Sequence, residues 1–340
     1  MKFKVKSFLK PALILAGLFF LVSCQKSQHK IYQSQKILMG TVFKIKVCAD
    51  NKISKKDFNL TANKAFDEIS RLEEQMSSYR DNSFVSKINK NAGVKPVKIT
   101  NEIIEVVDTA LEISKLSNGA FDITFGPLGK LWNVKHRQIP PSAKEIEKAR
   151  RLVNYKNIIL NKKSKTLFLS KKTMSIGLGG IAKGYAAKKI GEVLLNAGIE
   201  NFIVNAGGDL YFEGKKGKKL WTSAIKNPDN RQNLLIKFKV KGNTAVVTSG
   251  NYERGFIYEG KKYHHIINPK TGYPADGIKS VTVFAKNPTV GDGWATAFFI
   301  MGYDASLKIT SINPNIAFIM IDDKNRILKS GNVDNFAEII

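Results

Sequence analysis

The sequence predicts an α+β protein with mixed, largely antiparallel sheets flanked by helices. Several short segments alternate apolar and polar residues, which is typical of half-buried strands. Longer segments repeat apolar residues every three or four positions, as amphipathic helices do. The strand segments follow one another in pairs rather than alternating with helices, so a doubly wound parallel sheet is disfavoured. With 340 residues, 43% of them hydrophobic, the composition excludes disordered, collagen-like and disulfide-stapled chains.

The helical segments show apolar periodicity bounded by start and stop signals. A threonine precedes the segment that starts at Asn101, and an Asn-Gly pair follows it. A single glycine, Gly198, closes a later segment. The predicted helices are Thr61–Met76, Asn101–Ser117, Pro140–Arg151, Ile181–Ala197 and Asp292–Met301.

The strand segments are short, and several pairs are separated by Gly-, Asn- or Lys-rich turns. This spacing favours hairpins. The predicted strands are Thr41–Ala49, Ile158–Leu160, Thr166–Leu169, Phe202–Asn205, Leu210–Phe212, Leu234–Val240, Ala245–Thr248, Ile266–Ile267, Ser280–Ala285, Ile316–Ile321 and Ile327–Lys329.

The N-terminus has the pattern of an export signal. Residues 1–23 contain four lysines, no acidic residue and a twelve-residue apolar stretch, which is too short to span a bilayer comfortably. The stretch ends in Leu-Val-Ser before Cys24, which resembles a bacterial lipobox, where the thiol is lipidated and becomes the mature N-terminus. An ordinary signal peptide with an incidental cysteine is the alternative. We expect an exported protein anchored to a membrane by lipid on Cys24, a tether over residues 24–34 and one domain over residues 35–340.

The formal net charge of +27 raises the question of nucleic acid binding. The excess lysines lie in short clusters, such as Lys215–Lys219, beside turn-forming residues. Lysines scattered over turns are usually solvated, and attraction to anionic lipid explains such a charge more simply. We therefore expect no nucleic acid partner. Once Cys24 is lipidated, Cys48 is the one remaining thiol, so no disulfide is expected.

Two glycine-rich segments could approach a ligand. Gly177–Gly184 opens a helix, where backbone N–H groups favour an anion, and Lys183 adds a charge suited to phosphate. The spacing is neither that of a P-loop nor that of a dinucleotide fingerprint, so a plain turn is as good a reading. Asn205–Asp209 joins two strands, and its Asn and Asp could hold a ligand or only shape a hairpin.

Two further segments carry side chains suited to catalysis. In Tyr263–Gly272 two histidines are adjacent, and neighbouring strand residues face opposite sides, so only one of them can face a site. A structural histidine pair is the alternative. Asp292 and Thr296 are four residues apart on one helix face, and their oxygens suit a hard cation such as Mg²⁺. The alternative is Asp292 as a helix cap and Thr296 bonded to a carbonyl.

Taken in order along the chain, these segments and several others closely resemble the ApbE family. Its members are the FAD:protein FMN transferases, once called thiamine biosynthesis lipoproteins. The resemblance covers the chain from about residue 35 to its end, and the lipobox agrees with it. The blocks that carry it are Met39-Gly40-Thr41, Met76–Arg80, Gly119–Thr124 with Gly126-Pro127-Leu128, Gly179–Gly184, Asn205–Asp209, Thr248-Ser249-Gly250, His265–Gly272 and Gly291–Ala297.

The resemblance implies a fold, a reaction and a set of site residues. The fold is an α+β arrangement similar to the T-fold. The reaction is Mg²⁺-dependent transfer of FMN from FAD to a Thr or Ser hydroxyl of a target flavoprotein, with release of AMP. His265 is the implied base for that hydroxyl, and the implied Mg²⁺ ligands are Gly180, Asp292 and Thr296. The implied FAD-binding residues are Met39, Tyr79, Ala120, Phe121, Asp122, Lys183 and Ile266.

Two positions depart from the family pattern. Gly177 stands where the glycine loop usually opens with Asp, so a carboxylate expected near the flavin is missing. Ala295 stands where some members have a second Asp, which favours one Mg²⁺ ion and transfer over hydrolysis. The alternatives are an FAD pyrophosphatase that yields FMN and AMP, and a flavin-binding lipoprotein without turnover. The implied acceptor is a flavoprotein of a membrane redox complex, such as a sodium-pumping quinone reductase.

Overall fold

The computed structural model describes residues 29–49 and 53–340 and confirms the predicted α+β class. Its centre is an eight-stranded sheet in which every neighbouring pair of strands is antiparallel. In spatial order its strands are β1 (Lys30–Leu38), β2 (Thr41–Ala49), β6 (Phe202–Ala206), β7 (Asp209–Glu213), β10 (Thr244–Gly250), β13 (Ile278–Ala285), β14 (Ile316–Asp322) and β15 (Ile327–Lys329).

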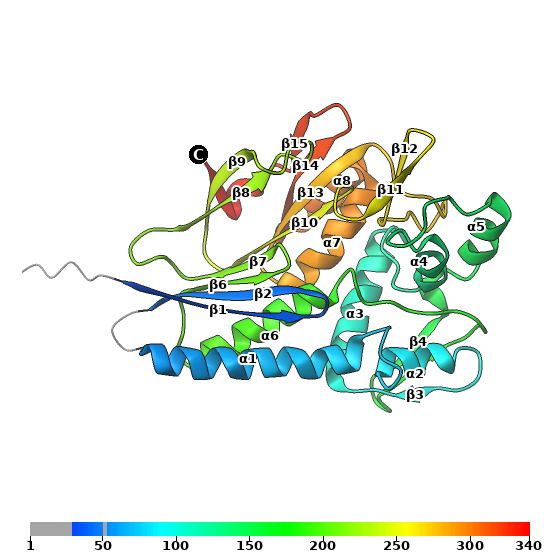
Figure 1. Cartoon of the computed structure of the whole chain (residues 1–340), viewed down its shortest axis with the longest axis horizontal. Coiled ribbons are helices and arrows are strands. Elements are labelled where there is room, and N and C mark those ends of the chain that lie inside the picture. Colours follow the sequence, from blue (N-terminus) through cyan, green and yellow to red (C-terminus); the bar gives the residue numbers. More distant parts are fainter. Residues whose placement is uncertain (1–28, 50–52) are drawn as a thin grey trace, which may run out of the picture.

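Long helices cover one face of this sheet and form the main core with it. In Figure 1, α1 runs beneath β1 and β2 and packs on β1, and α6 lies beside α1 and packs on β6 and β7. Helix α7 packs on β10 and β13, and α3 packs on α7, so the apolar stripes of all four meet in one cluster. Their bounds are α1 (Lys55–Met76), α3 (Asn101–Leu116), α6 (Ala182–Asn196) and α7 (Pro288–Met301).

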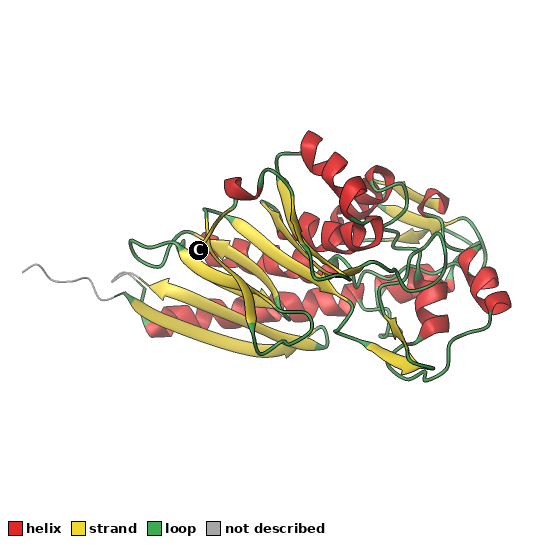
Figure 2. Cartoon of the chain, turned by 90° about the horizontal axis from the view of Figure 1, so that it is seen from above, coloured by secondary structure: helices red, strands yellow, loops and turns green. Residues whose placement is uncertain are grey.

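A second core lies on the other face of the large sheet. Apolar residues of β7, β10, β13 and β14 pack there against a three-stranded sheet, seen from above in Figure 2. All residues of β14 are buried, which explains its nearly continuous apolar sequence. The covering strands are β8 (Trp221–Lys226), β9 (Leu234–Val240) and β16 (Ala337–Ile339).

The remaining elements gather mainly at one end of the molecule (Figure 1). There a third apolar cluster joins the α4–α5 segment to the β11–β12 hairpin, and the indole nitrogen of Trp132 donates to the Gly272 carbonyl at 2.7 Å. No helix in residues 29–49 and 53–340 is long and apolar enough to cross a membrane. The bounds are α2 (Phe84–Lys90), β3 (Val97–Lys98), α4 (Gly126–Trp132), α5 (Ala143–Arg150), β4 (Ile158–Asn161), β5 (Thr166–Leu169), β11 (Gly255–Tyr258), β12 (Lys261–His264) and α8 (Tyr303–Ile312).

The structure corrects several predicted boundaries. Strand β1 begins at Lys30, inside the predicted tether, and its mostly exposed face at the sheet edge explains why its sequence carries so little apolar alternation. Ile266 and Ile267 are not a strand, because the strand before them ends at His264 and Ile267 makes only an isolated bridge. Helix α7 starts at Pro288, so Asp292 is not its cap. The predicted signal and Cys24 lie outside the described residues.

Candidate active site

The glycine loop brings the start of α6 into direct contact with α7. A Cβ atom on Gly184 would lie 2.2 Å from the Pro288 carbonyl oxygen and 2.8 Å from the Asp292 Cβ. Only glycine allows the two helices this separation. The Gly184 N–H then donates to Asp292 Oδ2 at 2.9 Å. The glycine after Lys183 therefore positions a buried carboxylate at the N-terminus of α6, where the helix dipole favours negative charge.

Lys183 lies between two buried carboxylates. Its ammonium nitrogen is 2.8 Å from Asp209 Oδ2 and 3.0 Å from Asp292 Oδ1. Burial lowers the pKa of Lys183, but the two carboxylates outweigh burial and raise it, so the lysine stays charged. Burial raises the pKa of Asp209; Lys183 opposes this and the charge of Asp292 adds to it. One cation thus faces two acidic groups in a largely desolvated site.

Asp209 is the member of this cluster that the sequence did not assign. It begins β7, directly after a tight turn in which Gly207 and Gly208 have φ of 66° and 108°. Asn205 shapes that turn by accepting the Gly208 N–H at 2.8 Å, whereas the Asp209 carboxylate points to Lys183. The sequence left open whether these two side chains hold a ligand or only shape a hairpin. Their contacts show that Asn205 shapes the turn, whereas Asp209 belongs to the site. A sequence signal for this role was available, because Asp209 is the one acidic residue in Asn205–Asp209, a segment that resembles an ApbE motif.

The three predicted Mg²⁺ ligands lie together. Thr296 follows Asp292 by one turn of α7, and a Cβ atom on Gly180 would lie 3.5 Å from Thr296 Oγ1. Carboxylate, hydroxyl and carbonyl oxygens are the donors that a hard divalent cation prefers. The Lys183 ammonium bound to the same Asp292 carboxylate shows that this place attracts positive charge. The donor set fits Mg²⁺, although no group of three or more His, Cys, Asp or Glu side chains in the described residues could hold a metal.

The two adjacent histidines have different environments. His264 is buried, accepts the Ile266 N–H at Nδ1 and lies 2.9 Å from the Ala275 carbonyl through Nε2, so it has a structural role. His265 is partly exposed, with Nδ1 3.4 Å from the Arg254 carbonyl. The pKa of His265 is lowered to about 4, mainly by burial; the hydrogen bond to the Arg254 carbonyl opposes this, and the charges of Arg254 and Lys183 add to it. His265 is therefore neutral near pH 7 and able to accept a proton.

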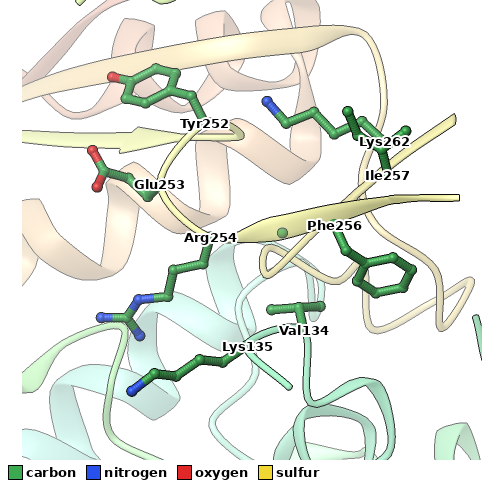
Figure 3. Close-up of a pocket in the computed structure, with 9 residues that line it drawn as sticks. Val134, Lys135, Tyr252, Glu253, Arg254, Phe256, Ile257 and Lys262 are labelled. Atoms are coloured by element: carbon green, nitrogen blue, oxygen red, sulfur yellow. The ribbon is translucent and has the colours of Figure 1, made fainter. Parts of the chain in front are cut away.

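A cationic pocket of about 410 Å³ is lined by residues of the segment that precedes β11 and by Lys135 (Figure 3). Arg254, whose carbonyl contacts His265, lines it, and its side chain extends in the same direction as that of Lys135. The acidic member, Glu253, is paired with Arg231 at 3.0 Å. The pocket also contains Lys262 and the rings of Tyr252 and Phe256, so its walls combine positive charge with aromatic surface.

Two of the predicted FAD-binding residues lie on neighbouring turns. Met39 is at the tip of the β1–β2 hairpin, and its N–H donates to Glu73 Oε2 of α1 at 2.8 Å. Tyr79 follows α1 and is 97% exposed, so its ring is free to stack on a flat ligand. Glu73 also lies 3.9 Å from Arg80, which links the two turns.

The other predicted FAD-binding residues are mostly buried. The Phe121 ring lies beside Gly180, 3.2 Å from where a Cβ would stand, and Ala120 is buried next to it. The Asp122 carboxylate accepts hydrogen bonds from Thr124 and from the Tyr155 N–H, and burial raises its pKa. It therefore holds its own loop at Thr124 and links that loop to the segment at Tyr155. Ile266 is buried in the main core.

Comparison with known proteins agrees with the family that the sequence motifs resemble. The model of the ApbE family matches residues 39–320. The chain belongs to the ApbE family. It is 30% identical over 306 residues to an FAD:protein FMN transferase of Klebsiella pneumoniae, covering 89% of this chain and 93% of that protein. It is also 30% identical over 327 residues to an FAD:protein FMN transferase of Treponema pallidum, covering 91% and 90%.

Solved structures of ApbE proteins share the fold. The ApbE protein of Thermotoga maritima superposes with a TM-score of 0.81 at 32% identity, covering 90% of this chain and 99% of that one. The flavin transferase ApbE of Vibrio cholerae gives a TM-score of 0.81 at 27% identity, covering 91% and 99%. The mixed, mostly antiparallel α+β architecture predicted from the sequence is therefore that of this ApbE chain.

Proposed function

We propose that this ApbE chain transfers FMN from FAD to a hydroxyl group of a target flavoprotein and releases AMP. The observation that carries the proposal is the cluster of Lys183, Asp209 and Asp292 beside the glycine loop, with neutral His265 nearby. A cation and an anion-favouring helix N-terminus suit a pyrophosphate. Relatives over most of the chain are named FAD:protein FMN transferases.

Each residue of the site has a separate role in the transfer reaction. The acceptor oxygen bonds to the phosphorus on the FMN side of the pyrophosphate, and the bond from that phosphorus to the bridging oxygen breaks. AMP leaves with the bridging oxygen, while His265 takes the hydroxyl proton. Lys183 offsets the negative charge that develops on the phosphate oxygens. Tyr79, Met39 and Phe121 border the flavin and hold it in place.

We propose that Gly180, Asp292 and Thr296 hold one Mg²⁺ ion. Bound there, the ion supplies electrostatic stabilisation of the phosphate oxygens as a Lewis acid. Oxygen-only donors and a buried carboxylate support this assignment. Replacing Asp292 with Ala is expected to abolish metal-dependent transfer, measured as covalent flavin per acceptor.

We propose further that the protein is exported and anchored to a membrane by lipid on Cys24. The lysine-rich start, the short apolar stretch and the Leu-Val-Ser-Cys sequence support this. The resemblance to the ApbE family implies that the acceptor is a flavoprotein of a membrane redox complex, and its flavin would then be attached outside the cytoplasm.

One incubation separates the candidate functions. The chain from residue 25 is mixed with FAD and Mg²⁺, with and without a candidate acceptor protein, and AMP and covalent flavin are measured. We expect both products only when the acceptor is present. AMP and free FMN without acceptor would make the protein an FAD pyrophosphatase, and unchanged bound FAD would make it a flavin carrier.

A further inference from the structure

We propose that Lys183 is a tethered counter-ion of the metal site, which leaves Asp292 when a divalent cation binds and remains paired with Asp209. This rests on the Mg²⁺ site of the proposed function and assigns Asp209 a role as a positioning residue. Lys183 contacts both Asp292 oxygens, at 3.0 and 3.3 Å, while it lies 2.8 Å from Asp209. The same ammonium group therefore bridges a proposed metal ligand and a carboxylate outside that ligand set.

Charge explains why a lysine belongs in this position. Asp209 and Asp292 are both nearly fully buried, so two carboxylates without a cation would repel each other strongly. Lys183 leaves the cluster with one net negative charge, and a divalent cation would change it to one net positive charge. The charge of the cluster is thus partly compensated without the metal, and the cluster attracts an anionic pyrophosphate once the metal is bound.

Geometry allows the lysine to move without losing its partner. Lys183 is in the first turn of α6, and its side chain is 30% exposed, so it is not locked by packing. Asp209 is fixed at the start of β7, with Oδ1 near the Thr248 N–H at 3.4 Å. Asp292 also accepts the Gly184 N–H, a bond that does not involve the Lys183 side chain. Asp209 therefore provides a fixed position for the ammonium group beside the site.

The proposal predicts that removing the charge of Asp209 and removing the charge of Lys183 change Mg²⁺ affinity in opposite directions. In Asp209→Asn, Lys183 has only Asp292 as a partner and competes harder, so Mg²⁺ should bind at least about tenfold more weakly. In Lys183→Met the competitor is gone, so Mg²⁺ should bind about tenfold more tightly. Asp209→Glu keeps the carboxylate and should remain within about threefold of wild type. Lys239→Met, which breaks the exposed 2.8 Å pair with Glu338, is the control and should change nothing.

The test is calorimetric titration of each variant with Mg²⁺, without FAD or acceptor, together with melting temperature. If Asp209 acts through Lys183, Asp209→Asn should change Mg²⁺ affinity by less than about threefold in the Lys183→Met background. An equal loss in both backgrounds would show direct attraction by Asp209 and overturn the proposal, as would unaltered affinity in Asp209→Asn alone. If Lys183→Met folds only with Mg²⁺, the proposal is supported; if Mg²⁺ does not restore its folding, the proposal fails.

This test is independent of the transfer reaction. A wild-type protein that transfers FMN but binds no Mg²⁺ by itself would contradict the exchange and leave the proposed function intact. A protein that shows the predicted affinities but transfers no FMN would support the exchange and contradict the function.

Discussion

At the scale of single residues, the environment of His265 decides what it can do. Its pKa is lowered to about 4 by burial, with nearby positive charges adding to the effect, so the neutral form predominates at every pH above that value. A base is active when deprotonated, so activity is lost as the pH falls through about 4 rather than near 6.5. His264 next to it is held by backbone groups and cannot take this role.

We expect the transfer rate to stay level from neutral pH down to about 5 and to fall below that. His265→Gln should lower the rate by about 100-fold or more, because general base catalysis contributes that much. The measurement is covalent flavin formed per minute across a pH series. His136→Gln, at an exposed position, is the control. An acid limb near 6.5, or a rate unaffected by His265→Gln, would contradict the assignment.

The ring of Phe125 explains why Gly177 can replace the usual Asp. A Cβ atom on Gly177 would lie 3.1 Å from that ring, so the ring takes the place where a side chain would begin. Gly177→Ala should lower the free energy of unfolding by about 1–2 kcal/mol through overpacking. Gly179→Ala, two residues on with open space around it, should change it by less than about 0.5 kcal/mol. Urea unfolding measures both, and equal effects would refute this explanation.

At the scale of elements, the crossing of α6 and α7 builds the site. The crossing depends on Gly184, where any side chain would meet the backbone of α7. Gly184→Ala should cost about 3 kcal/mol in unfolding free energy and also separate Lys183 from Asp292. A Cβ atom on Gly291 of α7 would have only side-chain methyl groups as its nearest neighbours, at 3.3 Å or more. The unfolding free energy of Gly291→Ala should therefore remain within about 1 kcal/mol of wild type. Thermal unfolding tests the pair, and a stable Gly184→Ala variant would contradict the role of this contact.

Local pattern predicted the elements with a clear apolar period; it missed the edge strand β1 and short elements such as α2, α4 and β8, although these three bury apolar side chains. The amphipathic helices and β2 were predicted because their apolar period is clear, whereas the edge strand β1 has mostly exposed side chains. The resemblance of the motifs to the ApbE family predicted that Asp292, Thr296 and Gly180 share one Mg²⁺ site. Asp209 lies in one of these motifs too, but the motif alone did not show its partner, because its pairing with Lys183 arises from sheet topology, which joins β7 to β10 beside α7.

At the scale of the whole molecule, the fold places the cluster of Lys183, Asp209 and Asp292 at the junction of helices and sheet, and the proposed lipid anchor on Cys24 precedes β1 in the sequence. Cys24→Ser should move the protein from the membrane fraction to the soluble fraction, because the lipid is the proposed attachment. Cys48→Ala, which alters the buried thiol of β2, should leave it in the membrane fraction. Immunoblots of both fractions measure this, and a Cys24→Ser protein that stays with the membrane would contradict the anchor.

The central claim is that this site joins FMN to a protein hydroxyl. The most direct measurement is the intact mass of a purified acceptor after incubation with FAD, Mg²⁺ and either the wild-type chain or Asp292→Ala. We predict that the wild type adds one phosphoester-linked FMN per acceptor and that Asp292→Ala adds none. An acceptor of unchanged mass with the wild type, while FAD is cleaved to FMN and AMP, would contradict the claim.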